Sequence, residues 1–406
     1  MAQQLLIIAG RFGNHAERGT LSSTSASVLF PLSRLADGRP MQDFRFSAAG
    51  TDDSITLDGD ILKGAGAFEA GISSSWAGSG GTWAVDSVVK DSGTQSAKLA
   101  HSASTSRTFD FYARSGEAFS KAWAIRGDGT ATAKIYLRNT RTGRYLKSDG
   151  TWTSTRTALD TQTTAAWQSG SITATVEAFT TALVPWVVMR WECELSASGS
   201  AWFDSTYIWP SWDFVSIHGH NLGPVTCELR SSTDGFSGSD TLEKTVTVAT
   251  PRFWARLDTP STRRYRRIKF VGTNHEPISL GEWVTGLAYA TGKIHEWGYE
   301  LRETYPDVSL AMPDGALHVA NVAPWPRLAF GAKFQRTDAQ AEEAEREIFG
   351  RCQGRAYPLV IVPDDSKPAA LFGRLGQTWA TARAFFNDYS QDDFVVNEEP
   401  FPRATY

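Results

Sequence analysis

The sequence is poor in the residues that mark several common protein classes. Its three cysteines, Cys193, Cys227 and Cys352, lie far apart and form no Cys-x-x-Cys pair, which argues against a zinc ribbon and against a disulfide framework. No run of about 18 apolar residues occurs, so we expect no membrane-spanning helix. The first residues, MAQQLLIIAG, have a short apolar core and no basic lead, and we expect a β-strand there rather than a signal peptide.

An excess of charge of one sign is also missing. The 406 residues include 40 Lys and Arg against 44 Asp and Glu, a net charge of −4 at pH 7, whereas a nucleic-acid binder usually has a basic excess. No GxSxG, HExxH, P-loop or GxGxxG motif lies in a strand–turn–helix context. We therefore expect no nucleic-acid partner, no enzymatic activity and no required cofactor.

The residues that are abundant favour β-structure. The chain has 35 Gly, 15 Trp and 22 Phe, and long stretches are dense in Ser, Thr and Gly. Such stretches are typical of short strands separated by turns. The length allows two to four domains of about 100–200 residues each. We predict a mainly β protein.

The composition changes along the chain and indicates an insertion. Residues 1–64 contain short apolar strands such as LLIIAG and DSITLDGDI. Residues 65–211 are rich in Ser, Thr, Gly and Trp, with turn signals at short spacing and no helical pattern, as in a jelly-roll β-sandwich. Short apolar strands like those of residues 1–64 resume over residues 212–300. We predict a discontinuous β-sandwich, 1–64 and 212–300, interrupted by an inserted jelly roll, 65–211.

The last segment, residues 301–406, has a different pattern. A capping-box pair, Thr337 and Gln340, opens TDAQAEEAEREIFG, in which apolar residues recur on one face as far as Ile348. Strand-like runs such as YPLVIVPD and DDFVVNEEP flank it. We predict a C-terminal α+β assembly domain with one helix over residues 337–350.

Both ends of the inserted segment carry a recognisable pattern. Its opening contains Phe68, Glu69 and Trp76, followed by a strand and a Ser-Gly-x-x-Ser turn at residues 92–96, and its last strand contains Asp204. In these features the segment resembles the carbohydrate-binding jelly rolls of the family 4/9 type. The resemblance implies a glycan-binding module, and it implies Glu69 and Asp204 as candidate ligands of a structural Ca2+.

Other motifs point to one biological setting. TGRYLKSDGTW resembles modules of this type in phage tail proteins, and DFVSIHGHNLG after ITLDGD resembles the discoidin-like or galectin-like sandwiches of phage tail-tip and adsorption proteins. The chain as a whole resembles a siphophage tail-tip protein of distal-tail or minor-tail type. This implies a virion protein, assembled in the host cytoplasm, that forms a ring of three or six copies. Its implied partners are other tail proteins (tail tube, hub, tape measure or fibres) and host-surface polysaccharide.

Glycan binding needs aromatic faces for sugar C–H surfaces and polar side chains for hydroxyls. Trp76 and Trp152 adjoin Gly-rich turns, so we expect them to be the more exposed tryptophans, whereas Trp191 and Trp202 lie in apolar alternation and should be core. A core role is the alternative for every candidate. The candidate glycan-binding residues are Trp76, Trp83, Trp123, Tyr136, Arg138, Trp152 and Trp167.

Three polar patterns have a functional and a structural interpretation. His218 and His220 have the i, i+2 spacing of a metal pair, but we favour a turn-forming pair at a strand end. Glu192 and Glu194 share a strand face, where a solvated surface is favoured over paired catalytic carboxylates. Arginine is enriched at protein–protein interfaces, so the basic run is predicted as a subunit interface, with a solvated strand or nucleic-acid contact as alternatives. The arginines of that run are Arg263, Arg264, Arg266 and Arg267.

Two other functions remain open from the sequence. The chain could be a soluble glycan-binding lectin or an accessory of a glycosidase, although neither an export signal nor a catalytic partner domain is visible. Alternatively, the inserted module is only architectural and binds nothing.

Overall fold

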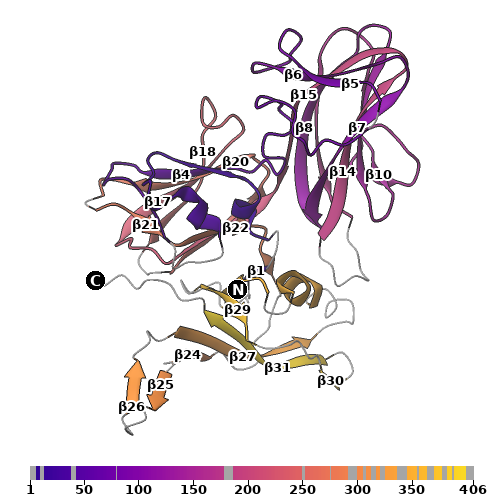
Figure 1. The fold of residues 1–406 in the computed structure, drawn as a ribbon. Helices are drawn as coiled ribbons and strands as arrows, with labels where there is room; N and C mark the ends of the chain where they lie inside the picture. The colour runs from indigo at the N-terminus through magenta and orange to yellow at the C-terminus, as the bar shows by residue number, and fades with distance from the viewer. Residues whose placement is uncertain are drawn as a thin grey trace.

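Antiparallel β-strands dominate the chain in the computed structural model, as Figure 1 shows. The mainly β fold predicted from the sequence is confirmed. Among the described residues, no helix has both the length and the apolar character needed to span a bilayer. The structure describes residues 6–398 except for 10–12, 38–42, 79, 178–185, 249–251, 275, 291–299, 305–307, 312–316, 321–324, 336–344, 354–355, 364–369, 377–381 and 386–387.

Residues 65–211, called the insert below, form two facing sheets whose described strands pair only with one another. One sheet has the order β11-β10-β9-β14-β7, with β12 also paired to β9, and the other has the order β13-β8-β15-β6-β5. The strands are β5 Thr82–Asp86, β6 Ser96–His101, β7 Thr105–Arg114, β8 Ala118–Arg126, β9 Thr132–Asn139, β10 Tyr145–Leu146, β11 Trp152–Thr153, β12 Asp160–Gln162, β13 Gln168–Thr175, β14 Trp186–Ser196 and β15 Gly199–Pro210.

The outer sandwich, in which the insert interrupts the chain, also has two sheets. A five-stranded sheet, β18-β17-β20-β4-β2, faces a three-stranded sheet, β19-β16-β22, and β21 pairs with β3. Its elements are η1 His15–Glu17, β2 Thr20–Ser23, η2 Leu32–Ala36, β3 Phe44–Arg45, β4 Ser54–Asp58, β16 Trp212–His218, β17 Val225–Ser232, β18 Thr241–Val248, β19 Arg252–Ser261, β20 Tyr265–Val271, β21 Ser279–Leu280 and β22 Glu282–Gly286.

The C-terminal unit is built on an eight-stranded sheet of order β23-β1-β28-β29-β31-β27-β24, with β30 paired to β31. The first strand of the chain belongs to this sheet, because β1 pairs with β28, and not to the outer sandwich to which residues 1–64 were assigned. The strands are β1 Leu6–Ala9, β23 Tyr289–Ala290, β24 Glu300–Thr304, β25 Val308–Ala311, β26 Leu317–Ala320, β27 Trp325–Gln335, β28 Leu359–Val362, β29 Leu371–Leu375, β30 Ala382–Phe385 and β31 Asp388–Glu398.

The predicted C-terminal α-helix is not supported by the part of the chain that the structure describes. Residues 337–344 of the predicted helix lie outside the described residues. The rest forms a π-helix, η3, Glu345–Gly350, in which Ile348 is buried as the apolar pattern predicts.

Strand β16 lies between the core of the outer sandwich and the core of the C-terminal unit. All seven of its residues are buried. Val215 and Ile217 face the core of the outer sandwich, whereas Phe214 packs with Val360 and Phe372 of the C-terminal sheet. A strand buried on both faces has apolar residues on both, and in WDFVSI the apolar Phe214 and Val215 are adjacent and face opposite sides.

A buried ionic cluster joins the insert to the outer sandwich. Glu117, between β7 and β8, lies 3.0 Å from Nε2 of His15 and accepts hydrogen bonds from Nη1 of Arg18 at 3.1 Å. Nη1 of Arg266 donates to Nδ1 of His15 at 2.7 Å. Because a guanidinium only donates, His15 must accept at Nδ1, so it is neutral and donates its Nε2 proton to Glu117.

The pKa values of this cluster follow from its burial and its charges. Burial lowers the pKa of His15 to about 3, which agrees with a neutral imidazole. Burial opposes ionisation of Glu117, but Arg18 and the hydrogen bond from His15 outweigh it and lower the pKa of Glu117 to about 2. The carboxylate of Glu117 therefore stays charged, and its bonds to His15 and Arg18 hold the insert to the outer sandwich.

A second ionic contact reaches the C-terminal unit. Arg114, the last residue of β7, donates to the carbonyl of Leu287 at 3.1 Å and to the carboxylate of Glu347 at 2.7 Å. Arg351 also pairs with Glu347. One end of β7 is thus tied to the C-terminal unit, close to the point where Glu117 is tied to the outer sandwich.

One core residue of the insert is a lysine. Lys121 of β8 is fully buried, its Nζ lies 3.1 Å from the ring centroid of Trp191, and no described group accepts a hydrogen bond from it. Burial lowers the pKa of Lys121 well below its usual value. Because the unfolded chain binds a proton here more readily, the penalty on stability grows as the pH falls below about 10.4.

We predict that Lys121→Met stabilises the protein at pH 7, because each unit by which burial lowers the pKa costs about 1.4 kcal/mol. The difference from the parent protein should shrink as the pH approaches 10. Urea unfolding at pH 7 and pH 10 measures both effects, with the exposed Lys90→Met as control. A variant less stable than the parent at pH 7 would contradict the prediction.

Candidate functional site

The outer face of the six-stranded sheet of the insert is the candidate site. Along β14, residues alternate strictly between the core and this face. Met189, Trp191 and Cys193 are buried, so Arg190 and Glu192 point outward. The alternation follows directly from the sequence WVVMRWECELS. The outer face is therefore polar, while its reverse supports the core.

Four side chains form a row across four strands of this face. The register pairs Tyr145 with Arg138, Arg138 with Arg190, and Arg190 with Asp110, so the row crosses β10, β9, β14 and β7. Arg190 makes two hydrogen bonds of 2.7 Å to the two oxygens of Asp110. The guanidinium of Arg138 lies 5.6 Å from the ring centroid of Tyr145. The row combines an ion pair, a cation and an aromatic ring.

A second group on the same face surrounds Arg156. Its guanidinium lies 4.0 Å from the ring centroid of Tyr136 and pairs with Glu192 at 2.7 Å and with Glu194. The hydroxyl of Tyr136 donates to Glu194 at 3.4 Å. Burial, and then the charge of Glu194, raises the pKa of Tyr136 to about 12, so the phenol keeps its proton as a donor.

Tyr112 gives this face an exposed aromatic ring. It lies on β7 two residues from Asp110, pairs in register with Val188 of β14, and is 48% exposed. Most tyrosines of this sheet are covered, as Tyr136 and Tyr145 are. An exposed ring beside fixed hydrogen-bonding groups is the arrangement that sugar binding requires.

The structure separates the predicted glycan-binding residues into two groups. Tyr136 and Arg138 lie on the outer face. Trp76, Trp83 and Trp123 pack instead in or against the core of the insert. The expectation that Trp76 is exposed is wrong: it is 8% exposed, and its indole donates to the carbonyl of Ala65 at 3.2 Å.

Trp152 and Trp167 are half-buried. Trp152 packs against the core, and its indole donates to the carbonyl of Thr175 at 2.9 Å. The prediction that Trp191 belongs to the core is confirmed. Trp202 is also buried, but it lies outside that core, covered by the charged side chains of Lys98 and Arg126. In this small sandwich the tryptophans mainly supply core volume.

Sequence reasoning missed the residues that form most of the outer face. Tyrosine and arginine supply the exposed groups, and the strand alternation in FDFYAR and VVMRWECE contains the signal that places them there. The candidate residues were chosen mainly for being tryptophan, and not for their position in the alternating pattern. The missed residues are Asp110, Tyr112, Tyr145, Arg156 and Arg190.

The predicted calcium ligands hold a loop instead. Glu69 accepts hydrogen bonds from the backbone and hydroxyl of Thr94, and Asp204 accepts from the backbone of Asp91, Ser92 and Ser205. Each of the four carboxylate oxygens already has a donor, whereas Ca2+ needs about six to eight oxygen ligands. Among the described residues no cluster of three acidic, histidine or cysteine side chains suits a metal. The donor set does not fit calcium.

The predicted subunit interface is wrong for Arg266, which is 1% exposed in the ionic cluster described above. Strand β20 lies in the middle of a five-stranded sheet, between β17 and β4, and its residues alternate between the core and the outer face, with Arg266 inward and Arg267 outward. Arg264 makes two hydrogen bonds to Asp58, and Arg267 lies over the ring of Phe236. Arg263 is half-buried.

The two histidines lie at a strand end, as the favoured interpretation predicts: His218 is the last residue of β16, and His220 belongs to the loop that follows. His218 is fully buried and hydrogen-bonds Ser216, and His220 is buried against the loop that follows it. Both belong to the outer sandwich, and neither is part of a metal cluster among the described residues.

No protein-family model and no curated protein matches the sequence. A solved family 61 carbohydrate-binding module in complex with β-1,4-galactotriose is similar at TM-score 0.26 and 15% identity, covering 36% of this chain and 95% of that chain. A family 22 xylan-binding domain from Paenibacillus barcinonensis gives TM-score 0.26 and 14% identity over 36% and 90%. The enzymatically active domain of tailspike protein 4 of bacteriophage CBA120 gives TM-score 0.27 and 11% identity over 36% and 21%. These scores are too low to carry an argument about function.

We predict that calcium does not stabilise the insert, because its four candidate oxygens already accept hydrogen bonds. The thermal unfolding midpoint should be the same in EDTA and in millimolar CaCl2. A ligand that binds only the folded state raises that midpoint with concentration. A midpoint that rises with calcium, and that loses the rise in Glu69→Gln, would overturn this prediction.

Proposed function

We propose that the insert binds host-surface polysaccharide through the outer face of its six-stranded sheet, and that the whole chain is a structural, non-enzymatic component of a phage tail tip. The observation that carries the binding role is the row of Tyr145, Arg138, Arg190 and Asp110, with Tyr112 exposed beside it.

The row suits an extended ligand better than a small one. Neighbouring strands lie about 4.8 Å apart, so four strands place side chains over about 14 Å. That length matches several linked sugars lying across the strands. Arg190 and Asp110 fix each other by two hydrogen bonds and remain half-exposed, so they offer pre-organised donors and acceptors to hydroxyls.

The tail-tip role rests on the resemblance of TGRYLKSDGTW in the insert, and of ITLDGD and DFVSIHGHNLG in the outer sandwich, to phage tail proteins. The ionic contacts of Glu117 and Arg114 agree with this role, because they hold the insert to its neighbours instead of leaving it on a free linker. In a ring, copies fixed in the same way would present identical faces together. A weak site then gains avidity through multivalency.

The test is Tyr112→Ala in the full-length protein, measured as binding to purified cell-wall polysaccharide by isothermal titration calorimetry. We expect at least a fivefold weaker Kd, about 1 kcal/mol, because an exposed aromatic anchor is lost. Leu242→Ala is the matched control: Leu242 of β18 has the same 48% exposure but lies on the outer sandwich.

Unchanged binding in Tyr112→Ala would contradict the proposed site. If the parent protein binds no polysaccharide, the insert is architectural and the binding role fails. If the purified protein is a monomer by light scattering and still binds the polysaccharide tightly, a soluble lectin is favoured over a ring component.

A further inference from the structure

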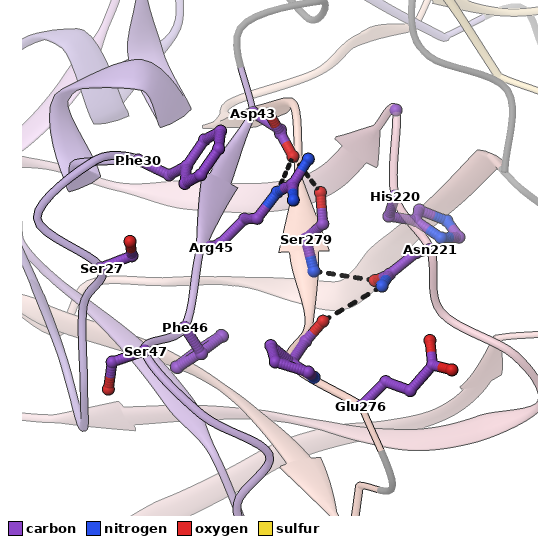
Figure 2. Close-up of a pocket in the computed structure, with 12 residues that line it drawn as sticks. Ser27, Phe30, Asp43, Arg45, Phe46, Ser47, His220, Asn221, Glu276 and Ser279 are labelled. Atoms are coloured by element: carbon purple, nitrogen blue, oxygen red, sulfur yellow. Dashed lines mark hydrogen bonds and ion pairs between the residues drawn. The ribbon is translucent and has the colours of Figure 1, made fainter.

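The outer sandwich contains a second site, distinct from the face just described. A pocket of about 490 Å³ opens where four segments meet: the loop after β2, strand β3, the loop after β16 and the approach to β21 (Figure 2). Its volume falls within the range of small-molecule sites. None of its lining residues belongs to the insert.

The frame of the pocket is fixed by hydrogen bonds between these segments. Asp43 accepts from Nε of Arg45 at 2.6 Å and from the hydroxyl of Ser279. The side chain of Asn221 accepts from the backbone of Ser279 at 2.7 Å and donates to the carbonyl of Pro277 at 3.1 Å. Figure 2 shows these bonds as a ladder along one wall. The pocket is therefore formed in advance.

Three groups at this pocket retain unused hydrogen-bonding capacity. His220 is 2% exposed, accepts from the backbone of Leu222 at Nδ1, and so has its proton on Nε2, which no described group accepts. Arg45 uses only Nε for Asp43, which leaves its terminal nitrogens as donors. Glu276 is exposed and supplies a carboxylate acceptor. The Nε2 atom is itself covered, so the groups that a ligand in the pocket can reach directly are the guanidinium of Arg45 and the carboxylate of Glu276.

The apolar surface of the pocket comes mainly from Phe30, because Phe46 is 1% exposed and packs in the core of the outer sandwich. Phe30 lies beneath Arg45, whose guanidinium is 4.2 Å from its ring centroid. The stacking holds Arg45 over one side of the pocket. Aromatic surface beside a few placed polar groups matches the composition of small-ligand sites.

The unused groups discriminate among ligand classes. Asp43 and Glu276 oppose an anion, and a simple cation would leave the terminal donors of Arg45 without an acceptor. A hydroxyl both donates and accepts, so neighbouring hydroxyls can satisfy the donors and the carboxylate together. We propose that this pocket binds a neutral, polyhydroxylated ligand: a single saccharide residue, independently of the polysaccharide face on the insert.

The experiment titrates the full-length protein with four monosaccharides, D-galactose, D-glucose, L-rhamnose and N-acetyl-D-glucosamine, by saturation-transfer NMR. Sodium acetate and glycine serve as the anionic and zwitterionic probes. We expect saturable binding of at least one sugar, and about tenfold weaker binding in Glu276→Ala because a charged hydrogen bond is lost. The matched control is Asp258→Ala, which removes an exposed carboxylate from a second pocket on the same sandwich.

A second variant tests the guanidinium. Arg45→Met keeps a flexible side chain beside Phe30 and removes the terminal donors, and it should weaken binding of the same sugar. Binding that survives in Tyr112→Ala supports a site separate from the insert, so the two proposals can fail independently. The proposal is overturned if no sugar binds, if acetate or glycine binds instead, or if Glu276→Ala and Asp258→Ala behave alike.

Discussion

A carboxylate without access to water determines how the insert sits on the rest of the molecule. Glu117 is 2% exposed, and it stays ionised because Arg18 and the Nε2 proton of His15 both bond to it. Arg266 fixes the tautomer of His15 from the opposite side. Removing one partner of such a buried pair typically costs about 3–5 kcal/mol, because the remaining charges stay desolvated. The attachment of the insert therefore has a definite geometry.

This geometry extends directly to the candidate glycan face. Arg18 also donates to the backbone carbonyl of Tyr112 at 3.4 Å, and Arg114 ties the end of β7 to Glu347. Strand β7 thus supplies Asp110 and Tyr112 to the outer face while its end is held by two other units. A surface fixed in this way loses little orientational freedom on binding, which is the condition under which repeated weak sites gain most from each other.

Strand alternation and composition predicted much of the fold. The insert, the resumption of the outer sandwich at Trp212, and strands such as β17 and β28 follow from apolar periodicity, which is local information. Two features could not be read locally. Strand β1 joins the sheet of a unit that begins some 300 residues later. The basic strand β20 is central because β4 pairs with it on one side and β17 on the other. Both depend on contacts distant in sequence.

The site was harder to predict than the fold for a related reason. Tryptophan has the largest aromatic face for stacking on a sugar, but the same face also fills a core. Only three-dimensional packing decides which of the two roles a given tryptophan has. Trp123 illustrates this: its ring packs in the core of the insert, and its indole donates to the half-buried Asp160 at 2.8 Å. The smaller Tyr112, which the sequence did not single out, is the exposed ring.

The central claim is that buried charge holds the insert rigidly on the outer sandwich. Spin labels at Ser87→Cys in the insert and Ser237→Cys in the outer sandwich would report it by double electron–electron resonance, since the three native cysteines are buried. The account predicts one narrow distance distribution, broadened by Glu117→Ala and unchanged by the surface control Asp258→Ala. A broad distribution in the parent protein, or no effect of Glu117→Ala, would contradict it.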